Sequence, residues 1–328
     1  MEKFNWGIIG TGKISATFAR TLAEVEGAVR YAAASRTEEK AREFAEKFGF
    51  EKHYGSYAEL AADKNIDAVY IATPMASHYA DAKQCLENGL NVLCEKSVTL
   101  NTAQLNELLA LAKEKNVFFM EAMWMKCRPA YLKAKQWIAQ GKIGQVKMVK
   151  GDFSNICPYD PDDRLFRPDC GGGALLDLAV YPLTLAMSVL GDEPDEVISS
   201  MNLCRGIDLS DSILLRYKNG TYASVFAGFE LALRNNALIS GTEGTIIFGD
   251  WFHCTCEVSL YDRSGKELEH FSQPDCSTGY EYEVEEVQRC LREGLKESPL
   301  VPHSGTLAVM KVMDRCRRQS GLTFPQEG

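Results

Sequence analysis

The sequence predicts an α/β protein with an N-terminal, doubly wound parallel sheet and a C-terminal domain built on a mostly antiparallel open sheet. Up to about residue 122, short apolar runs alternate with helical patterns of about 10–15 residues, which is typical of a parallel sheet with helical crossovers. From Glu196 onward, strand-like runs follow one another across turn signals, which indicates antiparallel hairpins. We therefore expect a first domain over residues 1–122 and a second over residues 123–328.

Composition fits a globular chain of this size. The 328 residues are 45% hydrophobic and 25% charged, and the net charge of −9 argues against a general nucleic-acid surface. We find neither a signal-peptide pattern nor an apolar stretch of about 18 residues, so we expect no membrane span. The eleven scattered cysteines indicate reduced, mostly buried thiols, no metal site and a cytoplasmic location.

The N-terminal residues MEKFNWGIIGTGKIS read as a strand, a glycine turn and the start of a helix. Gly10 allows a tight turn, and Gly12 lets the backbone approach a pyrophosphate. Ser15 stands at the third position of this dinucleotide-binding pattern, where glycine or alanine is usual. The N–H groups of the new helix would point at the phosphates. The residues expected to contact them are Gly10, Thr11, Gly12, Lys13 and Ile14.

The end of the second predicted strand, residues 29–34, decides which dinucleotide is favoured. An acidic residue there would bind the adenine ribose hydroxyls of NAD. Ser35 and Arg36 stand there instead, with Lys40 one helical turn further on. Because a guanidinium suits a 2′-phosphate, we expect NADP rather than NAD. NAD stays open as the less favoured cofactor, because Glu38 or Glu39 could still reach a ribose.

Two further strand ends carry polar residues. Thr73 and Pro74 follow the strand at 67–72, and His78 opens the next helix. Glu95 and Lys96 end the strand at 91–94. Ligands bind at the carboxyl edge of such sheets, so a lysine there could act as a general acid or base. The alternative interpretation of Lys96 is a surface lysine paired with Glu95. The alternative interpretation of His78 is a residue that merely begins a helix.

The second half contains a helix from Pro129, a strand at 146–153, a loop at 154–173 that ends in three glycines, and an apolar helix at 174–190. Asn219-Gly220 and Ser264-Gly265 each separate two strand-like runs, and helices at about 280–293 and 304–319 close the chain.

The helix at 174–190 carries one polar stripe, formed by Asp177, Tyr181, Thr184 and Ser188. A buried polar stripe needs partners, so it faces either a ligand or other polar groups of the core. Pro182 removes a backbone donor beside Tyr181 and could kink the helix there.

Taken together, these motifs resemble the glucose–fructose oxidoreductase / inositol dehydrogenase (Gfo/Idh/MocA) family over essentially the whole chain. The resemblance rests on GIIGTGKIS at 7–15, Ala72-Thr73-Pro74 followed by His78, Glu95-Lys96, and GGGALLDLAVYP at 171–182. It implies a Rossmann domain and an α/β domain whose open sheet often forms the oligomer interface. Glu121-Ala122-Met123-Trp124, Pro129 and Tyr181 look most like the dihydrodiol and D-xylose dehydrogenase subgroup, whose members use NADP.

By this resemblance, Lys96 and Tyr181 are the catalytic pair, with His78 supporting and Asp177 assisting. The cofactor site would also include Thr73, Pro74, His78, Glu95 and Lys96. The substrate would meet Trp124, Phe153, Arg164, Asp177 and Tyr181. Two positions depart from the family pattern: Ser97 replaces a proline that commonly follows a cis peptide, and Met75 stands where asparagine is usual.

We therefore expect an NADP-dependent oxidoreductase that transfers a hydride to or from a secondary alcohol or carbonyl of a sugar, polyol or cyclic diol. Its expected partners are that small molecule and further copies of the chain, in a homodimer or homotetramer formed through the C-terminal sheet, with no nucleic acid and no membrane. Two alternatives stay open. One is a non-catalytic NADP-binding sensor or scaffold, since a fold alone does not give activity. The other is an NAD-dependent glycosidase, which Arg36 disfavours.

Overall fold

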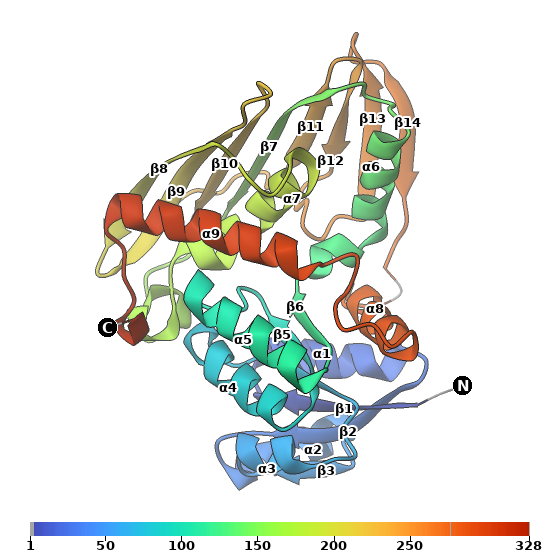
Figure 1. Cartoon of the computed structure of the whole chain (residues 1–328), viewed down its shortest axis with the longest axis vertical. Coiled ribbons are helices and arrows are strands. Elements are labelled where there is room, and N and C mark those ends of the chain that lie inside the picture. Colours follow the sequence, from blue (N-terminus) through green and yellow to red (C-terminus); the bar gives the residue numbers. More distant parts are fainter. Residues whose placement is uncertain (1–2, 276, 328) are drawn as a thin grey trace. The chain divides into compact units, whose positions relative to one another are not determined.

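The computed structural model describes residues 3–275 and 277–327, which belong to two compact units (Figure 1). The first unit comprises Met1–Trp124 and Cys276–His303, and the second comprises Met125–Asp275 and Ser304–Gly328. The predicted division into 1–122 and 123–328 is thus corrected for residues 276–303. This segment returns to the first unit because its helix α8 (Glu281–Arg292) packs against α1 (Lys13–Glu24) and buries Val284 and Val287.

The first unit is built on a six-stranded parallel sheet in the order β3-β2-β1-β4-β5-β6. The strand order reverses between β1 and β4, which confirms the doubly wound arrangement. The strands are β1 (Phe4–Ile9), β2 (Ala28–Ala34), β3 (Lys52–Tyr54), β4 (Ala68–Ile71), β5 (Asn91–Glu95) and β6 (Phe119–Ala122).

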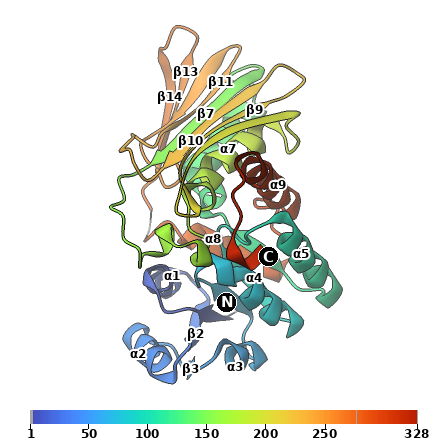
Figure 2. The same ribbon diagram turned by 90° about the vertical axis from the view of Figure 1, so that its left-hand side faces the viewer.

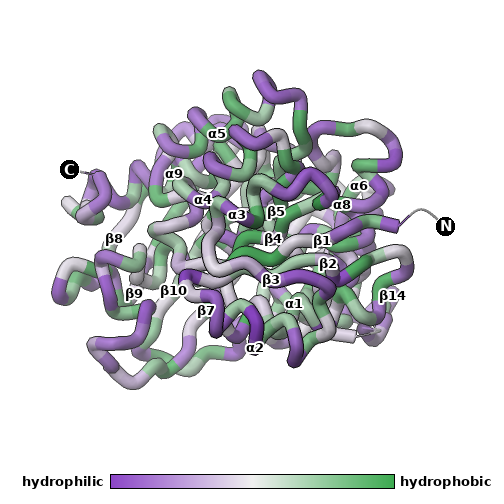
Figure 3. The backbone as a smooth tube through the Cα atoms, turned by 90° about the horizontal axis from the view of Figure 1, so that it is seen from below, coloured by the Kyte–Doolittle hydropathy of each residue, from purple (hydrophilic) through white to green (hydrophobic). Residues whose placement is uncertain are grey.

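Helices cover both faces of this sheet (Figure 2). On one face lie α1 and α2 (Glu38–Phe48), and on the other α3 (Tyr57–Ala62), α4 (Met75–Glu87) and α5 (Thr102–Lys115). Figure 3 shows why such strands are buried: the residues along β4 and β5 are hydrophobic, whereas those along much of α2 are hydrophilic. Two helix caps form on this sheet's helices: Thr37 accepts from the Lys40 N–H at 3.5 Å and Ser56 from the Glu59 N–H at 3.3 Å.

The second unit is built on an eight-stranded sheet in the order β14-β13-β12-β11-β7-β10-β9-β8. Its neighbours are antiparallel except for β7 and β10, which confirms the mostly antiparallel sheet. The strands are β7 (Val146–Ser154), β8 (Glu196–Cys204), β9 (Ile207–Arg216), β10 (Tyr222–Gly228), β11 (Ala237–Gly241), β12 (Gly244–Phe248), β13 (Glu257–Asp262) and β14 (Glu267–Ser272).

Helices α6 (Pro129–Ala139) and α7 (Val180–Leu190) pack on this sheet, and α9 (His303–Ser320) closes the chain. The helix predicted at 174–190 is not uniform. A π-helical turn, Leu175–Ala179, precedes α7, and Pro182 follows it in the first turn of α7. The expected irregularity beside Pro182 is therefore present as a widened turn. Pro182 also presses on β7, because a Cβ on Gly151 would lie 2.9 Å from the Pro182 Cβ.

The expectation that the chain holds no apolar stretch of about 18 residues is wrong for this region. Within the described residues, the segment Pro168–Leu190 is long and apolar enough to cross a membrane by length and composition alone. Its most apolar window is 83% buried inside the protein, as is typical of a core helix. Its hydrophobicity is thus explained by packing against β7 and β10.

The cysteines lie in both units. Ten of them are free thiols, of which five are buried and five are half-buried, and Cys276 lies outside the described residues. Among the described residues, no group of three or more His, Cys, Asp or Glu side chains is placed to hold a metal ion.

Candidate functional site

The glycine turn after β1 has the geometry that a dinucleotide phosphate requires. Gly10 has φ +99°, and a Cβ there would lie 2.7 Å from the Ala72 carbonyl oxygen, so only glycine fits. Gly12 caps α1, and a Cβ on it would meet no atom within 4 Å. The first turn of α1 holds no acidic residue and includes Lys13. These residues fit an anion held by backbone N–H groups and the helix dipole.

The ends of β1 and β2 are joined beside this turn. The Thr11 and Ser35 hydroxyls lie 3.2 Å apart, and Ile14 is half-buried at the start of α1. Ser15 is fully buried between helix and strand, and within the described residues its hydroxyl has no hydrogen-bond partner. The third position of the pattern therefore serves packing, as glycine or alanine would.

Arg36 and Lys40 are both exposed beyond the end of β2. Neither forms an ion pair within residues 3–275 and 277–327. Glu38 Oε1, in contrast, lies 2.9 Å from His53 Nε2. The side chains of Arg36 and Lys40 are therefore available at the position that contacts the adenosine ribose in such folds. Of the two acids there, Glu38 is in contact with His53.

His78 does not open its helix as expected, because α4 begins at Met75 and places His78 at the end of its first turn. The ring is 2% exposed. Its Nε2 lies 2.9 Å from the Thr73 carbonyl oxygen and its Nδ1 2.9 Å from the Ser97 carbonyl oxygen. Thr73 also donates from its hydroxyl to Asp81 at 2.6 Å. His78 thus ties together the segments that follow β4 and β5.

Lys96 lies directly after β5 and is half-buried. Its backbone N–H donates to Glu95 Oε2 at 3.2 Å, and Glu95 Oε1 accepts from the Tyr70 hydroxyl. The Lys96–Ser97 peptide is cis, although serine replaces the usual proline. Pro74, by contrast, is exposed at the start of α4, and Met75, where asparagine is usual, is buried. Glu95 therefore holds the backbone of the strand end that presents Lys96.

Glu283 of α8 is a residue that sequence reasoning missed. It is fully buried, and neither carboxyl oxygen has a hydrogen-bond partner among the described residues. Burial, reinforced by the nearby charge of Glu95, raises the pKa of Glu283 well above its usual value. The acid-rich run 281–286 reads as a solvated helix face, so only the return of α8 to the first unit explains this burial.

Trp124, expected to line the substrate pocket, ends the first part of this unit. Its ring stacks on Tyr280 with centroids 4.4 Å apart and planes 6° from parallel. The two residues are far apart in sequence, and the returning segment brings them together.

In the second unit, Tyr181 belongs to an aromatic cluster. Its ring centroid lies 5.5 Å from that of Phe153 and 4.9 Å from that of His253. Phe153 and His253 stack at 4.3 Å. The structure thus brings together the two predicted residues and adds His253, whose loop carried no motif.

Asp177 lies in the π-helical turn and pairs with Arg164 at 3.1 Å. The aspartate side chain is 11% exposed and the arginine 54%, so the arginine reaches it from the surface loop. At the far end of the stripe, the Ser188 hydroxyl donates to the Leu185 carbonyl at 2.8 Å. The polar stripe therefore has protein partners at its ends, with Tyr181 among aromatic rings.

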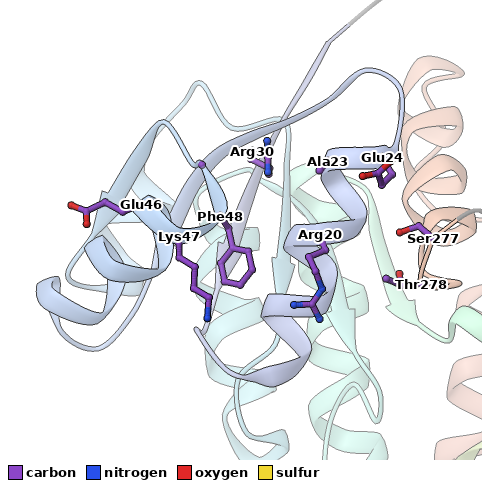
Figure 4. A pocket seen from close by; sticks show the side chains of 10 residues that line it. Arg20, Ala23, Glu24, Arg30, Glu46, Lys47, Phe48, Ser277 and Thr278 are labelled. Carbon is purple, nitrogen blue, oxygen red and sulfur yellow. The ribbon is translucent and has the colours of Figure 1, made fainter.

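A cavity of about 810 Å³ opens elsewhere in the first unit (Figure 4). Arg20 of α1 and Lys47 of α2 project on either side of the Phe48 ring, and Ser277 and Thr278 lie across from them. It contains none of the residues expected to bind cofactor or substrate.

Comparison with known proteins agrees with this fold. Residues 4–123 match the family described as "Oxidoreductase family, NAD-binding Rossmann fold", and residues 131–247 match the GFO/IDH/MocA C-terminal domain. Trans-1,2-dihydrobenzene-1,2-diol dehydrogenase of Xenopus laevis is 35% identical over 98% of this chain and 99% of its own.

Two solved structures share the fold. A 3-ketoreductase from Actinomadura kijaniata, in complex with NADP and TDP-benzene, matches with a TM-score of 0.85 and 25% identity over 97% of this chain and 98% of its own. Levoglucosan dehydrogenase, in complex with NADH and levoglucosan, matches with a TM-score of 0.85 and 22% identity over the same shares. The chain therefore belongs to the Gfo/Idh/MocA family of oxidoreductases and carries its NAD(P)-binding Rossmann domain.

Proposed function

We propose that this chain is an NADP-dependent dehydrogenase for a secondary alcohol of a sugar, polyol or cyclic diol. The observation that carries the proposal is Lys96, which is presented at the end of β5 in the same sheet as the dinucleotide turn and is braced by Glu95 and His78. The similarity to a dihydrobenzenediol dehydrogenase supports a diol or sugar as the substrate class.

The preference for NADP rests on the end of β2. Arg36 and Lys40 can pair with a 2′-phosphate, while the contact with His53 Nε2 occupies Glu38. Glu39 is exposed and leaves NAD as the weaker alternative.

In the proposed reaction, residues 10–14 would hold the dinucleotide, which would supply the hydride acceptor. The ionised phenolate of Tyr181 accepts the proton of the substrate hydroxyl and becomes the phenol, and the ammonium of Lys96 stabilises the developing negative charge on the substrate oxygen. In this proposal, Asp177 and Arg164 orient the substrate, and Trp124 and Phe153 offer aromatic faces to its apolar side.

An absorbance assay at the nicotinamide band tests this proposal. NADP⁺ and NAD⁺ are each offered with a panel of aldoses, inositols and trans-diols. We expect reduction of NADP⁺ with at least one diol or sugar and weaker use of NAD⁺. Tight nucleotide binding without turnover on any substrate would contradict the proposal and favour a sensor.

We further propose that the chain self-associates through the second sheet. On its exposed face, Ile198 lies opposite Leu214 and Met148 opposite Tyr222, and each of the four is at least 36% exposed. Such apolar pairs on a sheet face are typical of an interface. Sedimentation should show a dimer or tetramer for the wild type and a smaller species for Leu214→Lys. A monomeric wild type would refute this.

A further inference from the structure

Two carboxyl groups of β9 are buried without a counter-ion. Asp208 and Asp211 are each 1% exposed, and no lysine, arginine or histidine in the described part of the chain forms an ion pair with either. Burial raises the pKa of Asp208 to about 6. Burial and the charge of Asp208 raise the pKa of Asp211 well above its usual value. Two such neighbours cannot both ionise near neutral pH.

A β-bulge brings these two side chains to the same side. Residues three apart in a regular strand face opposite ways. Here Ser210 pairs with Asn202, but Asp208 pairs with the next residue, Leu203, so Leu209 is an extra residue in β9. Both aspartates consequently face the buried side of the strand.

Asp208 contacts the backbone where the π-helical turn begins. The Leu175 N–H donates to Asp208 Oδ2 at 2.5 Å. A Cβ on Gly173 would lie 2.2 Å from Asp208 Oδ1, so only glycine leaves room for this carboxyl. An ionised carboxylate is favoured here, since it accepts an N–H that the helix itself leaves unpaired and faces the positive end of the helix dipole.

We propose that Asp208 and Asp211 form an acid–carboxylate pair with one proton, in which Asp211 is the acid and Asp208 the carboxylate that positions the turn bearing Asp177 and leading to Tyr181. The assignment follows from the contacts. Asp208 accepts a backbone N–H, whereas within the described residues neither oxygen of Asp211 accepts one. Both are positioning residues, and only the kinetic consequence rests on the role proposed for Tyr181.

Two matched, isosteric variants test the assignment. Asp211→Asn keeps an uncharged donor beside Asp208, so we expect wild-type behaviour. Asp208→Asn removes the charge, and its amide oxygen is only a neutral and weaker acceptor for the Leu175 N–H. We expect amide hydrogen exchange over residues 174–181 to rise by about tenfold or more, and kcat to fall by a similar factor while NADP affinity is kept.

Infrared spectroscopy reads the proton directly. At about pH 7, where an isolated aspartate is ionised, the wild type should show carboxylic acid absorption beyond that of Glu283, and Asp211→Asn should remove this part. This readout holds even if Asp208→Asn fails to fold.

The proposed pair would be overturned if neither variant lost this absorption. It would also be overturned if the two variants changed amide hydrogen exchange equally. If the wild type turned over no substrate, the proposed function would fail, yet the infrared band and the exchange asymmetry would still decide this inference.

Discussion

His78 Nδ1 lies 2.9 Å from the carbonyl oxygen of Ser97, the residue that follows Lys96. The other ring nitrogen lies 2.9 Å from the Thr73 carbonyl oxygen. The histidine expected to support catalysis therefore fixes the backbone on either side of the strand ends.

Replacing His78 should impair turnover more than nucleotide binding. His78→Ala removes both hydrogen bonds and loosens the segment after Lys96, so kcat should fall by about 10- to 100-fold, in line with about 1–3 kcal/mol for a buried hydrogen bond. Steady-state kinetics and fluorescence titration of NADP check this. His53→Ala, which removes only a surface ion pair, serves as the control. Unchanged kcat in His78→Ala would remove His78 from the account.

Arg36 should discriminate between the two dinucleotides. Arg36→Ala should weaken NADP⁺ by about 10- to 100-fold, because charge-assisted hydrogen bonds contribute about 1.5–3 kcal/mol, and leave NAD⁺ nearly unchanged. Arg42→Ala, in the helix α2 that follows Arg36, removes a cation paired with Glu46 and should change neither. Equal losses for both nucleotides would show that Arg36 does not read the 2′-phosphate.

Ser15→Ala should stabilise the protein. The wild-type hydroxyl is fully buried and lacks a partner among the described residues, so its removal should raise the free energy of unfolding by about 1 kcal/mol. Thermal melts measure the change, and NADP affinity should be kept. A lower melting temperature would mean that the hydroxyl is satisfied.

Glu283 should make stability fall as pH rises. Its pKa is raised in the folded state, so the unfolded carboxyl, with a pKa of about 4.3, loses its proton first. Above that pH the folded state binds more protons, and stability falls by up to about 1.4 kcal/mol per pH unit until the folded group ionises.

Glu283→Gln carries no proton to lose, so its melting temperature relative to wild type should be higher at about pH 8 than at about pH 5. Denaturation at both pH values checks this, with Glu293→Gln, at the exposed end of α8, as the control. A constant difference between variant and wild type would mean that Glu283 ionises normally.

Local features of the fold were predictable from the sequence because local residues decide them. The glycine turn, the caps at Thr37 and Ser56, and the hairpin at Asn219-Gly220 each depend on a few neighbouring residues. That the residues after β1, β4 and β5 lie at one edge of the sheet was also predictable, since parallel strands end on the same side of a sheet.

Features that depend on distant packing were not predictable. The return of α8 buries Glu283 and stacks Tyr280 on Trp124, and no local pattern marks it. His253 joins Tyr181 from a loop without a motif. The bulge that turns both Asp208 and Asp211 inward depends on the register of β8 against β9.

The most direct test of the proposed function is Lys96→Met, measured for NADP binding and for turnover on the best diol or sugar. Methionine keeps the length of the side chain and removes the ammonium. We expect NADP to bind within about threefold of wild type, and kcat to fall by about 100-fold or more, as for the loss of a group that transfers a proton or stabilises charge in the transition state. Full turnover by a variant that binds NADP normally would contradict the account.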